Sequence, residues 1–131
     1  MQREIIFTED APQAIGTYSQ AVKIGNTIYL SGQIPLIPKT MELIEGDMKK
    51  QITRVFINLA AVAKASGGTL SDISKLNIYL INLSLLYTIN KSIYEVVRTK
   101  YGGGNGIRTY NSTWFIDLLM DTGQSSDYQN T

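Results

Sequence analysis

The sequence has 131 residues, of which 44% are hydrophobic and 18% charged, and its 12 basic and 11 acidic side chains give a formal net charge of +1. This composition is typical of a single globular domain, here expected to span residues 1–131, and the balanced charge argues against nucleic acid or an anionic membrane as a partner. Cysteine and histidine are both missing from the sequence, which excludes disulfides, thiolate chemistry, Ser-His-Asp triads and the usual zinc ligands.

The N-terminal residues carry charges where a secretory signal needs an apolar run, and no stretch of the sequence approaches the roughly 20 apolar residues of a membrane span. No cluster of acidic residues resembles a calcium-binding loop. We therefore expect a cytoplasmic protein without a metal or a cofactor. Its chemistry would depend on carboxylates, Arg, Lys, Tyr, hydroxyls, backbone amides or water.

The first part of the chain has the pattern of three short strands. Glu4–Phe7 is the first strand, and Thr8–Ser19, which contains a proline and a glycine, is expected to be a loop. Ala21–Ile24 and Thr27–Ser31 are β-rich, and Gly25-Asn26 between them tolerates the positive φ of a tight turn. The pattern predicts a β-hairpin.

Residues Asp47–Ser66 have a strongly helical pattern. Asp47 can cap the first turn, and Gly67-Gly68 can end the helix in the left-handed conformation. Apolar side chains recur at spacings of three and four along one face, namely Met48, Ile52, Val55, Phe56, Leu59 and Val62. Because no aromatics alternate with the basic residues, we expect a solvated helix face rather than a nucleic-acid stripe at Lys49, Lys50 and Arg54.

A further strand and a further helix follow. Ile73–Asn82 is β-rich with apolar residues on both alternating faces, which predicts a central strand, and Ser84–Lys100 has the pattern of a second helix. The order strands, helix, strand, helix, strand favours an α+β sandwich of one sheet on two helices. Because the sequence offers no third layer of helices for the other face of the sheet, we expect oligomerisation to cover it.

Residues 11–21 read APQAIGTYSQA and resemble the N-terminal signature of the RidA/YjgF family, usually APxAIGPYSQA, with Thr17 in place of the proline. Further pieces occur in the order and at the spacing of the family. They are Ser31-Gly32-Gln33, Gln51, Asn58-Leu59, Gly67, Asn90 with Tyr94, and Gly106-Ile107-Arg108-Thr109 where the family has Pro-Ala-Arg-Ser/Thr. The likeness covers residues 3–110, and on this basis the chain is identified as a member of the family.

The resemblance implies a chorismate-mutase-like sandwich, with one mixed sheet packed on two helices, assembled as a homotrimer with clefts between subunits. It implies hydrolytic deamination of reactive 2-imino acids or enamines, such as 2-aminoacrylate or 2-iminobutanoate, to 2-oxo acids and ammonia. By motif, Arg108 and Tyr18 would be catalytic, and Ser31, Gly32 and Asn90 would bind the substrate.

This chemistry needs neither histidine nor cysteine. The Arg108 guanidinium can hold a carboxylate through two parallel charge-assisted hydrogen bonds, and a protonated imine is already electrophilic, so the protein has mainly to position it against a water. The Tyr18 hydroxyl and the backbone near Ser31-Gly32 would orient the nitrogen or the water. Outside the motif, each of these residues reads as an ordinary exposed arginine, packing tyrosine, strand end or polar helix position.

The same cleft suits a second function, that of a non-catalytic binder of small carboxylates. Ribonuclease or translation-regulating activity is also associated with the family. The near-neutral charge and the absence of histidine argue against that third function.

After Arg108 the likeness ends. The family continues to a last strand of the type VEIEAIA, which supplies a glutamate thought to assist the water, whereas this chain continues TYNSTWFIDLLMDTGQSSDYQNT. Asp117 and Asp121 are the nearest acids, and neither aligns. Either the tail has diverged, which would leave a weakened enzyme or a binding protein, or the reading frame shifts near Thr109. We expect residues 111–120 to pair with the sheet, or the protein to be less stable than its relatives.

Overall fold

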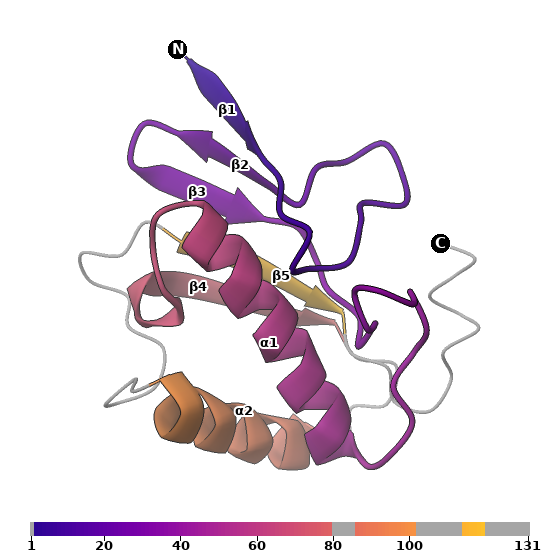
Figure 1. The fold of residues 1–131 in the computed structure, drawn as a ribbon. Coiled ribbons are helices and arrows are strands. Elements are labelled where there is room, and N and C mark those ends of the chain that lie inside the picture. Colours follow the sequence, from indigo (N-terminus) through magenta and orange to yellow (C-terminus); the bar gives the residue numbers. More distant parts are fainter. Residues whose placement is uncertain (1, 80–85, 102–113, 120–131) are drawn as a thin grey trace.

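The structure is a computed structural model, and it describes residues 2–79, 86–101 and 114–119 (Figure 1). The elements follow one another as β1 (Arg3–Ile6), β2 (Ala21–Ile24), β3 (Thr27–Leu30), α1 (Met48–Ala65), η1 (Leu70–Asp72), β4 (Ile73–Tyr79), α2 (Leu86–Tyr101) and β5 (Trp114–Leu119). The strands and helices expected from the sequence are present. The one-turn 3₁₀ helix η1 was not predicted.

The five strands of the described residues form one mixed sheet in the order β1-β2-β3-β5-β4. The first three strands are antiparallel neighbours, and β5 is parallel to both β3 and β4. The expectation that residues 73–82 form a central strand was therefore wrong, because β4 lies at the edge of the described sheet and β5 takes the interior position. Leu76 and Ile78 pack against the core while Lys75 is exposed, so β4 is half-buried rather than covered on both faces.

The segment after the family likeness still supplies a strand. Trp114 is paired with Ile28 on one side and Ile73 on the other, and the pairing with β4 continues to Leu119. This confirms the first of the two outcomes expected for residues 111–120, over the part that the structure describes. The polar residues 123–131 lie outside the described residues.

The hairpin of β2 and β3 is tight, as its sequence predicts. Ile24 is paired with Thr27, which leaves Gly25 and Asn26 as the two turn residues, and Gly25 has φ of +59°. This φ lies in the left-handed region that glycine adopts without the steric cost of a Cβ. The turn fixes the register that brings the start of β2 beside the end of β3.

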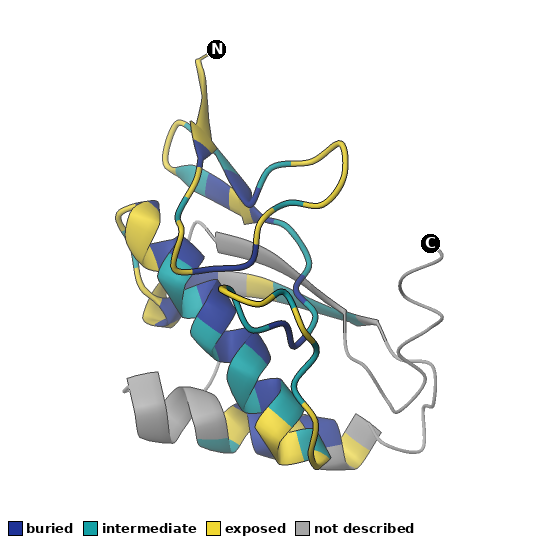
Figure 2. Cartoon of the chain, turned by 45° about the vertical axis from the view of Figure 1, so that its right-hand side comes forward, coloured by how far each residue is buried: buried dark blue, intermediate teal, exposed yellow. Residues whose placement is uncertain are grey.

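Helix α1 covers one face of the sheet and buries the apolar stripe expected of it (Figure 2). Asp47 caps its first turn, where the carboxylate accepts a hydrogen bond from the Lys50 backbone N–H at 2.9 Å, and Gly67 follows its end with φ of +92°. The buried residues of α1 are Ile52, Val55, Phe56, Asn58, Leu59, Val62 and Ala63. Replacing a buried phenylalanine such as Phe56 by alanine costs about 3–5 kcal/mol, so this stripe carries much of the stability.

Two polar residues on α1 depart from a simple amphipathic pattern. Asn58 is fully buried, and its Nδ2 donates to the Leu36 carbonyl oxygen at 2.8 Å, which attaches the segment after β3 to the helix. Arg54 is partly buried, with Nε out of contact with water, so the expected solvated basic face holds for Lys49 and Lys50 only.

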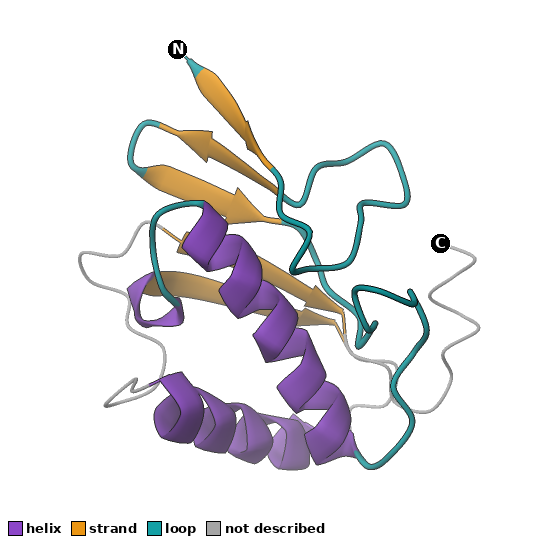
Figure 3. Ribbon diagram, viewed as in Figure 1, coloured by secondary structure: helices purple, strands orange, loops and turns teal. Residues whose placement is uncertain are grey.

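Helix α2 packs beside α1, so that both helices lie on the same side of the sheet (Figure 3). Ile89 and Ile93 join the common core, and Lys49 of α1 forms an ion pair with Glu95 of α2, with Nζ and Oε2 3.5 Å apart. The α+β sandwich of one mixed sheet on two helices is therefore confirmed. In the part of the chain that the structure describes, no helix is long and apolar enough to cross a membrane.

Candidate functional site

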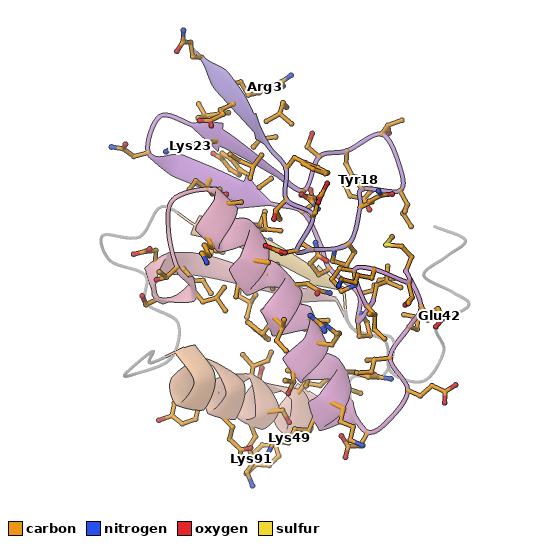
Figure 4. The ribbon with its side chains drawn as sticks, in the orientation of Figure 1. Arg3, Tyr18, Lys23, Glu42, Lys49 and Lys91 are labelled. Carbon is orange, nitrogen blue, oxygen red and sulfur yellow. The ribbon has the colours of Figure 1, made fainter. Side chains whose placement is uncertain are left out.

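Tyr18 lies near the end of the loop that joins β1 to β2, and its side chain is 48% exposed (Figure 4). Its hydroxyl oxygen accepts a hydrogen bond from the Ile15 backbone N–H at 3.3 Å. The ring lies close to Gly16, where a Cβ would approach ring atom Cε1 to 3.1 Å. Because the backbone N–H is the donor in this contact, the phenolic proton remains available for a second partner.

Ser31 directly follows β3 and is joined to the end of this loop by two hydrogen bonds. Its hydroxyl donates to the Ser19 carbonyl oxygen, and its backbone N–H donates to the Gln20 carbonyl oxygen at 3.0 Å. The structure therefore joins Ser31 to the two residues that directly follow Tyr18. Because the Ser31 hydroxyl proton is donated to Ser19, only the hydroxyl oxygen can still accept a hydrogen bond from a ligand. Gly32, the next residue, is partly exposed.

Gln20, the residue directly before β2, has a structural role that the sequence did not indicate. Its side chain is only 3% exposed, and Oε1 accepts from the Thr8 backbone N–H at 2.7 Å. The Nε2 group donates to the carbonyl oxygens of Thr8 at 3.0 Å, Pro12 at 2.9 Å and, with a longer contact, Ala11 at 3.4 Å. One signal could have found it, since Gln20 belongs to the same signature segment as Tyr18.

The register of the sheet brings a carboxylate-bearing residue to the same region. In the parallel pairing of β3 with β5, Leu30 is level with Ile116. The next residues along the two chains are Ser31 and Asp117, and Asp117 is itself paired with Asn77 of β4. Asp117 does not align with the family glutamate in the sequence, but the strand pairing places its backbone in the sheet, beside Asn77.

Asn90 is not brought to Tyr18 within the described part of one chain. Asn90 is exposed on α2, and its neighbour Lys91 lies at the far end of the molecule from Tyr18 (Figure 4). Arg108 lies outside the described residues. Ser31 is joined to the two residues that follow Tyr18, and the expectation that all five predicted residues line one cleft stays a prediction.

A cavity of about 660 Å³ lies elsewhere, at the outer end of the β1–β2 pair. It is lined by Gln2, Arg3, Glu4, Lys23 and Gly25, none of which was expected at the site. Figure 4 shows Arg3 and Lys23 well away from Tyr18. Among the described residues, no group of three or more acidic side chains is placed to hold a metal ion.

Comparisons with known proteins agree with this fold. The model of the endoribonuclease L-PSP family matches residues 8–108. A RutC family protein of Pyrococcus abyssi is 45% identical over 95 residues, which are 72% of this chain and 75% of the relative. A Dermatophagoides farinae protein named 2-iminobutanoate/2-iminopropanoate deaminase is 41% identical over 99 residues, 76% of this chain and 77% of the relative.

Solved structures give the same result. The crystal structure of RidA from an Antarctic Psychrobacter bacterium is 38% identical, with a TM-score of 0.66, and the match covers 86% of this chain and 83% of that chain. The mixed sheet with two helices on one side is thus the α+β fold of the RidA proteins. The chain belongs to the RidA/YjgF family, also called the endoribonuclease L-PSP or RutC family.

Proposed function

We propose that this protein hydrolyses reactive 2-imino acids and their enamine tautomers to 2-oxo acids and ammonia. The observation that carries the proposal is the 41% identity to the relative named 2-iminobutanoate/2-iminopropanoate deaminase. The local geometry supports it, because Tyr18 offers an exposed hydroxyl that accepts from Ile15, and the next residue along the chain, Ser19, is bonded to Ser31 at the end of β3. A tyrosine and backbone groups are sufficient to orient an electrophile that reacts readily with water.

In the proposed reaction, Arg108 holds the substrate carboxylate through two hydrogen bonds. The oxygen of a water forms a bond with the iminium carbon and loses a proton. That proton then passes to the nitrogen, the carbon–nitrogen bond breaks, and ammonia leaves as the new hydroxyl group gives up its own proton to solvent and becomes the carbonyl group. The Tyr18 hydroxyl donates a hydrogen bond to the attacking water or to the substrate, with its own oxygen held by Ile15.

Asp117 is the proposed acceptor of the water's proton. It is the one acidic residue of β5, and it follows Ile116, whose partner in β3 is Leu30, the residue before Ser31. A carboxylate within hydrogen-bond reach of a water can act as its general base. The aspartate is one methylene shorter than the glutamate that the resemblance to the family implies, which fits the expectation of a weakened activity.

We further propose that the active form is a homotrimer with the site between subunits. On the face of the sheet away from the helices, Ile5, Val22 and Tyr29 are paired across three strands, and Ile5 and Tyr29 are 56% and 47% exposed. Covering such a row with a second copy removes apolar surface from water. Since Asn90 lies far from Tyr18 in one chain, its predicted part in binding also calls for a neighbouring subunit.

The proposal is tested by supplying the imine from a pyridoxal-phosphate-dependent threonine dehydratase and following 2-oxobutanoate and ammonia. The protein should release both faster than spontaneous hydrolysis does. The Arg108→Ala variant should abolish the acceleration with an unchanged circular dichroism spectrum, whereas Arg3→Ala, which removes an exposed arginine from β1, should keep it. No acceleration by the unmodified protein would refute the proposed activity.

One observation favours the alternative of a non-catalytic binder of small carboxylates. The family model ends at residue 108, so the segment that would complete the catalytic groups departs from the family. Calorimetric binding of 2-oxobutanoate, lost in Arg108→Ala and unaccompanied by faster imine decay, would establish the binder and exclude the deaminase.

A further inference from the structure

We propose that Gln20 is the residue that positions Tyr18, by fixing the shape of the loop from Thr8 to Ser19. This inference rests on the proposed function for its catalytic meaning, but not for its structural content. Gln20 is placed to act on Tyr18 through the backbone of the loop, and it is a positioning residue rather than a catalytic one.

The loop has few bonds of its own. Within residues 9–18, which the structure describes in full, no backbone N–H donates to another backbone carbonyl. The internal contacts are those of the Asp10 N–H with the Thr8 hydroxyl at 3.2 Å and of the Ile15 N–H with the Tyr18 hydroxyl. A segment of this kind has no secondary structure to hold its shape and needs side-chain contacts instead.

The Gln20 carboxamide supplies those contacts. Both its oxygen and its nitrogen bond to the Thr8 backbone, and the nitrogen also bonds to the Pro12 carbonyl oxygen. The amide is buried, so losing one partner leaves a polar group without water to replace it. The first half of the loop is thereby fixed to the residue that begins the return into β2.

Tyr18 is fixed from the opposite end. Ser19 and Gln20 are bonded through their carbonyl oxygens to Ser31, and the Tyr18 hydroxyl reaches back to Ile15. The position of Ile15 depends in turn on the path that leaves Pro12. Gln20 therefore sets the relation between the two ends of the loop, and through it the place of the Tyr18 hydroxyl.

The Gln20→Glu variant tests this directly, because it keeps the shape and the oxygen that accepts from Thr8 but replaces the donor by a second acceptor. Gln20→Met is the neutral companion, of similar length and without either group. Gln13→Glu, on the exposed part of the same loop, introduces the same charge and is the matched control. Both Gln20 variants should raise the hydrogen-exchange rate of the Ile15 amide at least tenfold, and Gln13→Glu should leave it within twofold.

The catalytic consequence is tested by a double-mutant cycle with Tyr18→Phe. Gln20→Glu alone should lower kcat about tenfold with little change in KM, and should lower it less than twofold further when Tyr18 is already phenylalanine. A residue with a merely structural role would reduce the activity equally in both backgrounds, and that result would overturn the inference. If the unmodified protein has no deaminase activity, the proposed function fails while the exchange measurement still decides the role of Gln20.

The exchange measurement also decides the matter if the Gln20 variants do not fold. In the unmodified protein, the Thr8 amide, bonded to Gln20, and the Ile15 amide, bonded to Tyr18, should exchange at similar rates after correction for their intrinsic rates. If the Ile15 amide exchanged more than a hundredfold faster than the Thr8 amide, the part of the loop around Ile15 would open independently of the Gln20 hydrogen bonds. The inference would then be wrong.

Discussion

The Ser31 hydroxyl donates a hydrogen bond to the Ser19 carbonyl oxygen, which joins the end of β3 to the residue directly after Tyr18. A serine that the sequence marks as a substrate ligand is thus also a structural contact of the loop. The two parts need not conflict, because a hydroxyl that donates one hydrogen bond can still accept others.

The Ser31→Ala variant should lower both stability and activity. Loss of the bond to Ser19 should reduce the free energy of unfolding by about 1 kcal/mol and kcat/KM by about tenfold. Urea denaturation and the coupled deaminase assay measure the two effects. The control is Ser71→Ala, which removes an exposed hydroxyl from η1. Equal activity of the two serine variants would contradict a role for Ser31 at the site.

Gly16→Ala should displace the Tyr18 ring. The added Cβ would lie 3.1 Å from ring atom Cε1, closer than the ordinary van der Waals separation, so the exposed ring should move rather than the backbone. We expect kcat to fall severalfold while the free energy of unfolding changes by less than about 1 kcal/mol. An unchanged kcat would show that the reaction does not depend on this placement of the ring.

Asn58→Ala should destabilise the fold without touching the site. The variant leaves the Leu36 carbonyl oxygen without the donor it has at 2.8 Å and removes a fully buried side chain. The expected loss is about 1–3 kcal/mol from the unpaired group, with a further cost for the space vacated. Urea denaturation should separate it clearly from Lys50→Ala on the exposed face of α1, expected within about 0.5 kcal/mol of the unmodified protein.

Tyr29→Glu should disrupt the proposed homotrimer. The substitution introduces a charge in the middle of the row that Ile5 and Val22 complete on the open face of the sheet. Sedimentation equilibrium should give three times the 14.5 kDa chain mass for the unmodified protein and a lower mass for the variant. Tyr87→Glu, at an exposed tyrosine of α2, is the matched control. A monomeric unmodified protein would rule out the trimer.

Asp117→Asn should slow the reaction by tenfold or more if Asp117 is the acceptor of the water's proton, since removing a general base typically costs about 10²–10⁴-fold. Asp121→Asn should have little effect. Measuring kcat/KM for both variants distinguishes the two acids that the sequence left open. The reverse order of the two effects would reassign the base to Asp121.

The sequence predicted the elements whose signals are local. Gly25-Asn26 gave the hairpin, and Asp47 with Gly67 gave the ends of α1, because turns and caps depend on residues a few positions apart. The place of β5 was not predictable in this way. Strand order depends on pairing between distant segments, so the pattern at 73–82 suggested a central strand where the structure has an edge.

The contacts around the candidate site could not be predicted from the sequence for the same reason. The signature segment identified Tyr18, but the bonds that fix it come from Gln20 and from Ser31, and these depend on how the loop folds back on the hairpin. Asp117 could be related to Ser31 only through the parallel pairing of β3 with β5. The predicted anchor Arg108 stays a prediction.

The interior position of β5 has a consequence for the order of events during synthesis. Strand β5 is made after α2, yet in the sheet it lies between β3 and β4. Before β5 has been made, β3 and β4 therefore each lack the strand that lies between them in the final sheet. Until residues 114–119 emerge, both unpaired backbones are open to each other and to other chains. The sheet is therefore completed late, when β5 inserts between β3 and β4 after both helices have been made.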